Sequence, residues 1–270
     1  MSLDSSQPNC RRFDDQIAIV TGGAQGIGKA TAIRLAAEGA TVLIADRAEK
    51  EAQEVAEIIA ATNGEASTVQ VDLETWEGAE TVVNTAVERY GQVDVAVHNV
   101  GGTIWAKPYH LYPIEQIEKE IQRSLWPTLW GCRAVIPQMI RQQSGAIVNV
   151  GSVATRGINR VPYSAAKGGV AAITVCLSME LAEENIRVNC VAPGGVDGGE
   201  RAVPRNVGLG DYDQVDADGI KGVMEQTFRD TPMNRMGTPD ELAAAIAYMA
   251  SADAAYVTGE VLNCSGGGRG

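Results

Sequence analysis

The sequence has few aromatic residues, few histidines and only scattered cysteines. Phenylalanine and histidine each occur twice in 270 residues, and aromatic side chains make up 5% of the chain. The five cysteines form no Cys-x-x-Cys pair: Cys10, Cys132, Cys176, Cys190 and Cys264. These shortages exclude a histidine-rich metal site and argue against a zinc ribbon or a disulfide framework. Scattered thiols are typical of a reducing compartment, so we expect a cytoplasmic protein.

Long apolar runs and positive net charge are also missing. The first residues contain no apolar core of signal-peptide length, and no run approaches the roughly 18 apolar residues of a membrane span. The net charge is −12, a sign that repels phosphate backbones, so we expect neither nucleic acid nor a membrane as a partner. No linker rich in Pro, Gly or Ser divides the chain. We therefore predict a flexible N-terminal tail over residues 1–13 and one domain over residues 14–270.

Short apolar runs alternate along the chain with helical stretches of ten residues or so. The runs predicted as strands are 16–21, 41–45, 67–71, 93–97, 146–150, 186–191 and 260–263. The predicted helices are 30–38, 49–62, 77–90, two stretches within 114–139 that are interrupted near Pro127, 164–183, and one after Glu241. This alternation is typical of an α/β fold, in which a doubly wound parallel sheet has helices on both faces.

Residues 194–230 break the alternation. This segment is rich in Gly, Asp and Pro and contains no clear strand. Long loops inside compact domains are usually functional, so we predict that the segment is a substrate lid.

A glycine-rich segment, TGGAQGIG, follows the first predicted strand and leads into the first helix. Gly22 permits the tight turn, Gly26 lets the backbone approach a pyrophosphate, and Gly28 lets the helix pack closely on the strand. Gln25 and Ile27 belong to the same loop. Because a helix N-terminus offers free N–H groups and a positive dipole, the segment predicts a dinucleotide site.

Asp46 ends the second predicted strand, 18 residues after Gly28. A carboxylate there can accept hydrogen bonds from both ribose hydroxyls of NAD, and it repels the extra phosphate of NADP. We therefore predict NAD as the cofactor, while the neighbouring Arg47 leaves some use of NADP open. Further cofactor-binding candidates follow the third and fourth strands, where ligands of open parallel sheets bind: Asp72, Leu73, Asn99, Val100 and Gly101.

A Tyr-x-x-x-Lys pattern begins the helix predicted over 164–183. Tyr163 and Lys167 are four residues apart and share one helix face, so phenol and ammonium can act on one substrate. A lysine near a phenol favours the phenolate and lowers the pKa of the tyrosine. Ser152, just after a predicted strand, can hydrogen-bond the same substrate oxygen. The three residues predict an acid/base site in which a carbinol loses its proton to Tyr163 and a hydride to nicotinamide.

The chain resembles the short-chain dehydrogenase/reductase family over nearly its whole length. The motifs that carry the resemblance stand in family order: TGGAQGIG, Asp46, VDL, HNVG, Ser152, YSAAK, NCVAPGG and YVTGEVLNCSGGG. The resemblance implies a Rossmann fold with a seven-stranded sheet, a nicotinamide cofactor and a homotetramer. Surplus apolar residues such as Trp126 and Trp130, beyond one helix face, also favour an oligomer.

The chain departs from the family pattern at three places. The family's helix asparagine, which holds a proton-relay water, aligns with Ser124, so we include Ser124 among the catalytic candidates. Ser152 lies two residues closer to the tyrosine than is usual in the family. The threonine common after the Pro-Gly turn is missing, so we expect backbone groups of Val191 and Val196 to contact the cofactor carboxamide instead, with Pro193 and Gly194 as further cofactor-binding candidates.

Three stretches, NVGGTIWAKP, SLWPTLW and SVATRGINRVPY, look like those of bacterial cis-dihydrodiol dehydrogenases of aromatic-acid degradation. This likeness implies NAD-dependent oxidation of a carboxylated cis-dihydrodiol, 1,6-dihydroxycyclohexa-2,4-diene-1-carboxylate, to a catechol. A p-cumate dihydrodiol is the close alternative, and reduction of a 3-oxoacyl thioester is the alternative on the same fold. A non-catalytic dinucleotide sensor would not need Ser152, Tyr163 and Lys167 together.

Such a substrate needs a cation for its carboxylate and an apolar wall for its ring. Arg156 and Arg160 lie between Ser152 and Tyr163, and a guanidinium can hold a carboxylate with two hydrogen bonds. We predict that one of these arginines binds the carboxylate. Further predicted contacts are Asn159 for the second hydroxyl and Trp105 with Ile104 for the ring. Weaker candidates for the carboxylate are Lys107, His110, Arg201 and Arg205.

Overall fold

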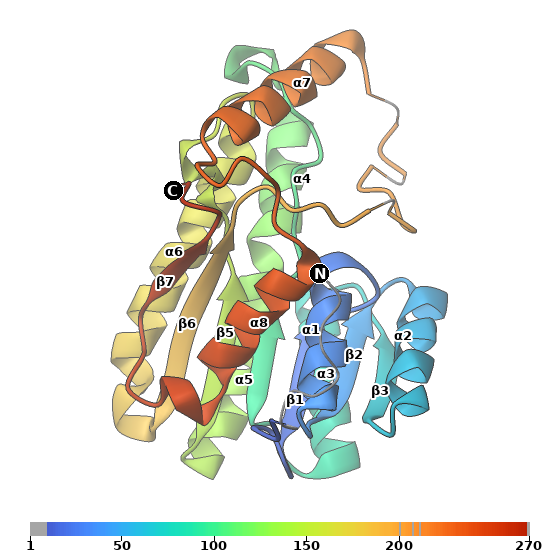
Figure 1. The fold of residues 1–270 in the computed structure, drawn as a ribbon, viewed down its shortest axis with the longest axis vertical. Coiled ribbons are helices and arrows are strands. Elements are labelled where there is room, and N and C mark those ends of the chain that lie inside the picture. Colours follow the sequence, from blue (N-terminus) through green and yellow to red (C-terminus); the bar gives the residue numbers. More distant parts are fainter. Residues whose placement is uncertain (1–9, 200, 207, 211, 269–270) are drawn as a thin grey trace.

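A computed structural model describes residues 10–199, 201–206, 208–210 and 212–268. Seven parallel strands form one sheet in the order β3-β2-β1-β4-β5-β6-β7 (Figure 1). The strands are β1 (Ile17–Thr21), β2 (Thr41–Asp46), β3 (Glu65–Gln70), β4 (Val95–His98), β5 (Gly145–Val150), β6 (Ile186–Pro193) and β7 (Val261–Cys264). Each begins and ends within two residues of its predicted range. The doubly wound, seven-stranded Rossmann sheet is confirmed.

Helices cover both faces of this sheet. The helices are α1 (Gly26–Ala37), α2 (Glu49–Ala61), α3 (Trp76–Tyr90), α4 (Ile114–Ser124), α5 (Trp126–Gln142), α6 (Val161–Leu181), α7 (Gln214–Arg229) and α8 (Pro239–Ala250). Short 3₁₀ turns are η1 (Tyr109–Leu111), η2 (Val153–Arg156), η3 (Ala182–Glu184) and η4 (Ala252–Ala254). One core cluster joins α1, α2 and α8 to the sheet, and a second joins α3, α5 and the C-terminal part of α6 to its other face.

Burial on both faces explains why the strands are continuously apolar. In β2, Val42 and Ile44 belong to one core cluster, whereas Leu43 and Ala45 belong to the other. Successive side chains of a strand point to opposite faces, so a strand with helices on both sides needs apolar residues throughout. The strand order reverses between β1 and β4, which opens a crevice beyond their carboxyl ends.

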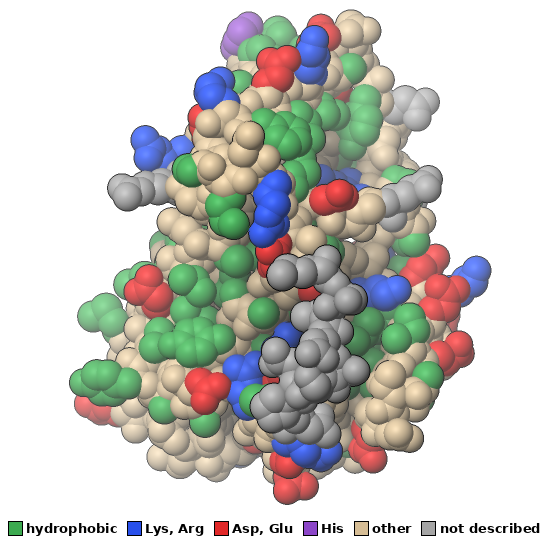
Figure 2. Space-filling view, in the orientation of Figure 1, with side chains coloured by type: hydrophobic (Ala, Val, Ile, Leu, Met, Phe, Trp, Pro, Cys, Tyr) green, Lys and Arg blue, Asp and Glu red, His purple; other side chains and the backbone are tan. Residues whose placement is uncertain are grey.

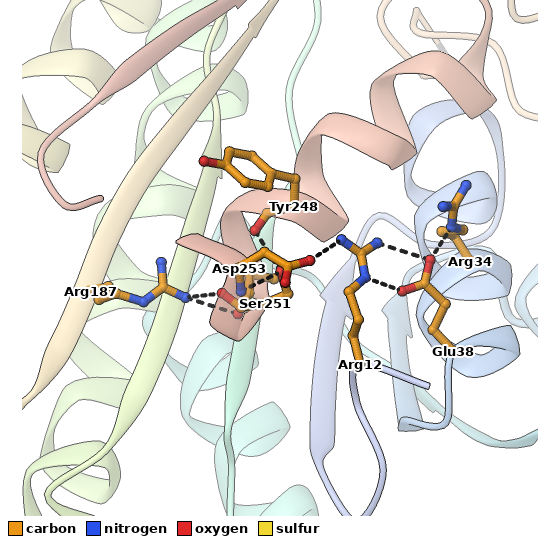
Figure 3. A network of polar contacts seen from close by, with 8 residues as sticks. Arg12, Arg34, Glu38, Arg187, Tyr248, Ser251 and Asp253 are labelled. Carbon is orange, nitrogen blue, oxygen red and sulfur yellow. Dashed lines mark hydrogen bonds and ion pairs between the residues drawn. The ribbon is translucent and has the colours of Figure 1, made fainter. Parts of the chain in front are cut away.

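The N-terminal segment is anchored sooner than predicted. Residues 1–9 lie outside the described part of the chain, but Phe13 is fully buried in the core cluster of α1 and α8. Arg12 forms ion pairs with Glu38, at the end of α1, and with Asp253, after α8 (Figure 3). The prediction of a flexible tail up to residue 13 is therefore wrong at its last residues, because an aromatic side chain and a two-sided ion pair attach them to the domain.

The prediction of a loop over residues 194–230 is also wrong, because its second half is helix α7. Asp213 caps this helix by accepting a hydrogen bond of 2.7 Å from the Asp216 backbone N–H. The helix lies beyond the strand ends, apart from the sheet (Figure 1). A Cβ at Gly219 would overlap the Ala106 carbonyl oxygen, so this glycine lets α7 pack against the segment after β4. Lys107 and Asp216, both buried, fasten the same contact with an ion pair of 3.1 Å.

Helix α6 and its continuation to Glu184 have the length and mean hydropathy, 1.3, of a membrane-spanning helix. The helix nevertheless packs between β6 and α4, and it buries Tyr163 and Lys167 within the domain. Only 33% of its apolar window is buried, and large apolar side chains such as Val175 and Met179 remain exposed on its other face.

Candidate active site

A cleft of about 680 Å³ lies at the carboxyl ends of the strands. Segments that follow β1 to β6 line it, and residues 198–199 and 201–205 cover it from the other side. Because the carboxyl ends of parallel strands meet at one edge of the sheet, residues far apart in sequence come together here.

The glycine-rich loop forms one end of the cleft. Gly22 and Gly26 have positive φ angles of 63° and 58°, which L side chains rarely adopt. A Cβ at Gly28 would overlap the Gly22 carbonyl oxygen and would lie 2.6 Å from Asn99 Nδ2. Asn99 Nδ2 donates hydrogen bonds of 3.1 Å to the carbonyls of Thr21 and Gly22 and thereby braces the turn. The loop is thus rigid, with the first turn of α1 open to the cleft.

Asp46 is fixed at the end of β2. Its Oδ2 accepts from the Ala24 N–H and its Oδ1 from the Ala48 N–H, each at 3.0 Å. These bonds hold the carboxylate at the wall of the cleft, beside Arg47. The carboxylate therefore stands where a group emerging from the glycine loop would meet it.

The other predicted cofactor residues are brought to the same cleft, apart from Gly28, which packs behind the loop. The predicted cofactor residues that line it are Gly22, Gln25, Gly26, Ile27, Asp46, Asp72, Leu73, Asn99, Val100, Gly101, Tyr163, Lys167, Pro193, Gly194 and Val196. Gln25 also exchanges two hydrogen bonds of 3.2 Å with the backbone of Val203. No local sequence pattern predicts these two bonds, which tie the glycine loop to the segment that covers the cleft.

Ser152, Tyr163 and Lys167 line the cleft together. Tyr163 lies in the first turn of α6 and Lys167 one turn later, while Ser152 caps η2 directly after β5. Lys167 Nζ donates to the Val150 carbonyl at 2.7 Å, and burial lowers the pKa of Lys167 to about 8. An amine held in this way can exchange a proton near neutral pH.

The pKa of Tyr163 differs from the expectation. Burial raises the pKa of this phenol, and the Ser152 hydroxyl, Arg205 and Arg160 oppose the rise. The sequence predicts that Lys167 lowers this pKa, whereas in the structure the cations that lower it are Arg205 and Arg160.

Ser124 lies beside this group but does not line the cleft. It is fully buried at the end of α4, and its Oγ accepts a hydrogen bond of 3.3 Å from the Gly102 N–H. A Cβ at Gly101 would lie 2.9 Å from Lys167 Nζ, so the Gly101–Gly102 turn passes between Ser124 and Lys167. The structure thus gives Ser124 a part in holding this turn.

Five residues predicted to contact the substrate line the cleft: Ser152, Ile104, Arg160, Arg201 and Arg205. Trp105 is buried in a cluster with Ile104 and Tyr112, and of the adjacent pair only Ile104 also lines the cleft. Asn159 turns at a positive φ of 57°, and its carbonyl accepts from the Lys107 N–H and the Tyr112 hydroxyl. Trp105 and Asn159 therefore lie outside the cleft.

Arg156 is the third predicted substrate residue outside the cleft. It is exposed and lines an adjoining cavity of about 430 Å³. It does not line the cleft that holds Tyr163. Two of the weaker candidates for the carboxylate also lie elsewhere. Lys107 forms an ion pair with Asp216, and His110 is exposed on η1.

Sequence reasoning missed two charged residues of α4. Arg123 lines the cleft, pairs with Glu74 and donates to the Arg205 carbonyl at 3.2 Å. Glu120 is fully buried, and its Oε1 accepts from the backbone N–H groups of Ile104 at 2.7 Å and Trp105 at 2.9 Å. Burial raises the pKa of Glu120 to about 7. A charged residue on a polar helix gives no signal of burial, so only the structure shows these roles.

Comparisons with known proteins agree with this geometry. The family model described as short chain dehydrogenase matches residues 16–205. The 1,6-dihydroxycyclohexa-2,4-diene-1-carboxylate dehydrogenase of Acinetobacter baylyi is 47% identical, over 96% of this chain and 98% of the relative. The 2,3-dihydroxy-2,3-dihydro-p-cumate dehydrogenase of Pseudomonas putida is 34% identical, over 96% of each chain.

Solved structures show the same fold. Levodione reductase superposes with a TM-score of 0.84 at 30% identity, over 95% of this chain and 98% of that chain. A 7α-hydroxysteroid dehydrogenase, complexed with NADH and 7-oxo glycochenodeoxycholic acid, superposes with a TM-score of 0.82 at 27% identity, over 97% of each chain. Fold, site and sequence matches agree, and the chain belongs to the short chain dehydrogenase family.

Proposed function

We propose that this protein oxidises a carboxylated cis-dihydrodiol, 1,6-dihydroxycyclohexa-2,4-diene-1-carboxylate, to a catechol with NAD as the oxidant. The observation that carries the proposal is that Arg160, a cation, lines the same cleft as Ser152 and Tyr163 and acts on the Tyr163 phenol. The 47% identical relative bears the name of this activity. The reaction would belong to the degradation of aromatic acids in the cytoplasm.

The residues of the cleft fit a nicotinamide dinucleotide. A Cβ at Gly26 would meet nothing within 4 Å, so the loop leaves open space before the first turn of α1, where a pyrophosphate can approach free N–H groups. The Asp46 carboxylate, which two backbone N–H groups hold in place, would accept hydrogen bonds from the ribose hydroxyls and would repel a 2′-phosphate. Bound there, the nicotinamide supplies a hydride acceptor.

The chain's own residues then handle the substrate proton. Ser152 donates a hydrogen bond to the carbinol oxygen, and Tyr163 accepts the hydroxyl proton as the carbinol carbon gives up its hydride. The product is a β-keto acid. Its bond to the carboxylate carbon breaks, CO₂ leaves, and the electron pair remains in the ring, which becomes a catechol after taking up a proton. Aromatisation drives this last step, so no separate catalytic group is required.

The decisive experiment is incubation of the purified protein with NAD and the cis-diol. We expect NADH and catechol in equal amounts, and neither product with Tyr163→Phe. If the protein leaves the diol unchanged but reduces a 3-oxoacyl thioester with NADPH, the alternative activity replaces this proposal. If the protein oxidises the p-cumate diol in preference to the benzoate diol, its substrate is that named for the 34% identical relative.

We further propose a homotetramer and a lid formed by residues 194–230. Large apolar side chains are exposed on two helices, with Trp126 on α5 and Val175 and Met179 on α6. Figure 2 shows exposed hydrophobic side chains on the side where α6 and β7 lie in Figure 1. Apolar surface of this kind favours association with further copies of the chain. Light scattering that finds a monomer at micromolar concentration contradicts the tetramer.

A further inference from the structure

Four arginines that form no ion pair among the described residues line the cleft, Arg47, Arg160, Arg201 and Arg205, and two of them, Arg160 and Arg205, act on the Tyr163 phenol. Arg160 precedes α6 and Arg205 belongs to the segment that covers the cleft, and both line it. In the part of the chain that the structure describes, no ion pair involves either guanidinium. Arg160 Nε is buried and has no hydrogen-bond partner. A buried donor without a partner is unfavourable, so this geometry suits an anion that is bound only during the reaction.

Arg205 is held in position from two sides. Its carbonyl accepts from Arg123 Nη1 at 3.2 Å, and Arg123 is itself paired with Glu74. Its guanidinium lies against Gly102, where a Cβ would be 3.0 Å from Arg205 Nε. The backbone anchor and the glycine together hold this side chain at the wall of the cleft, where it remains exposed to solvent.

The two guanidiniums act on the same small region. Burial lowers the pKa of Arg160, and the charge of Arg205 lowers it further. Both arginines also oppose the rise in the pKa of Tyr163. Two like charges that repel each other beside a phenol are relieved when one anion binds between them. Such a local cation pair can hold an anion in spite of the net charge of −12 on the chain.

We propose that Arg160 and Arg205 together bind the substrate carboxylate and make the cleft selective for anionic diols. This inference rests on the proposed function and extends it to a residue from the covering segment. Each guanidinium can donate two hydrogen bonds to a carboxylate. Arg156 has no part in the contact, since it lines only the adjoining cavity, whereas Arg160 lines both cavities and Arg205 lines the cleft.

The first test measures binding of benzoate to the protein saturated with NADH, by titration calorimetry. Arg160→Ala and Arg205→Ala should each weaken benzoate binding about 10- to 150-fold, the effect of losing a charge-assisted contact. Arg156→Ala is the matched control on the neighbouring turn and should bind benzoate like the unmutated protein. Unchanged NADH affinity in each variant shows that the fold is intact. The proposal is overturned if Arg205→Ala binds benzoate as tightly as Arg156→Ala does, or if the unmutated protein binds benzamide as tightly as benzoate.

The second test compares kcat/KM for the benzoate cis-diol and for the uncharged cis-diol of benzene. In Arg205→Ala the loss should fall on the acidic diol alone, and Arg205→Lys should recover part of it because a point charge remains. An equal loss on both diols would show a merely structural role and would refute the proposal. If the unmutated protein oxidises neither diol, the proposed function fails, while the benzoate titration still decides whether the two arginines form an anion site.

Discussion

The stability of the protein should depend on pH through Glu120, and Glu120→Gln should remove this dependence. Glu120 is fully buried in α4, and its Oε1 accepts hydrogen bonds from the backbone N–H groups of Ile104 and Trp105. Its Oε2 is buried without a hydrogen-bond partner. Burial is the main cause that raises the pKa of Glu120 from 4.5 to about 7, against opposing contributions that include Arg123. In the folded protein the carboxyl group of Glu120 therefore keeps its proton to a higher pH than it does in the unfolded chain.

The sign and the size of the effect follow from proton linkage. Between pH 4.5 and 7 the folded protein keeps a proton on Glu120 that the unfolded chain has already released. The free energy of unfolding therefore falls as pH rises through this range, by about 3 kcal/mol for a shift of this size. In Glu120→Gln the amide oxygen still accepts both N–H groups, but nothing ionises. Relative to the unmutated protein, the variant should gain about 3 kcal/mol between pH 4.5 and pH 8.

Urea unfolding at a series of pH values measures this gain. The protein concentration is held constant, because oligomerisation also stabilises the folded state. Glu118→Gln is the matched control, since Glu118 is exposed on the same helix and its replacement should leave the pH profile unchanged. A difference between Glu120→Gln and the unmutated protein that stays constant from pH 4.5 to 8 would refute the reasoning, because Glu120 would then have an ordinary pKa.

Three further predictions concern the two halves of the cleft. Asp46→Ala should lower kcat/KM for NAD and reduce the preference over NADP, and equal use of both cofactors by the unmutated protein would contradict the role of Asp46. Gly28→Ala should abolish NADH binding in a fluorescence titration, because the Cβ would overlap the Gly22 carbonyl. Gly219→Ala should raise KM for the diol without changing NADH affinity, since it displaces α7 from Ala106; an unchanged KM would show that α7 does not shape the substrate side.

The sequence was sufficient to predict which residues meet around the glycine-rich loop. Short apolar strands, a glycine turn and a carboxylate after β2 are local patterns, and the parallel sheet brings their ends together without further information. The Tyr163–Lys167 pair could be predicted because its spacing is that of one helical turn. Backbone geometry dictates these positions, so local sequence and strand order are enough to place them.

The substrate half could not be predicted in the same way, because its residues are fixed by tertiary contacts. Trp105 and Ile104 are adjacent, and both of their backbone N–H groups donate to the buried Glu120, yet only Ile104 lines the cleft. Arg156 and Arg160 stand four residues apart and both line the adjoining cavity, but only Arg160 also lines the cleft. A loop has no regular periodicity, so its sequence does not predict on which side each of its side chains lies.

Buried charges connect the substrate half to the rest of the fold, and this has a consequence for specificity. Lys107 with Asp216 fastens α7, and Arg123 with Glu74 anchors Arg205 over the cleft. Removing one partner of a buried pair leaves an uncompensated charge, which typically costs about 3–5 kcal/mol. Substitutions that retune the substrate should therefore be tolerated at Arg160 and Arg205, which carry no ion pair among the described residues, and should fail at the pairs that support them. The selectivity of the cleft should therefore change without unfolding the frame that presents it, because the cations of the proposed anion site are not those of the buried pairs.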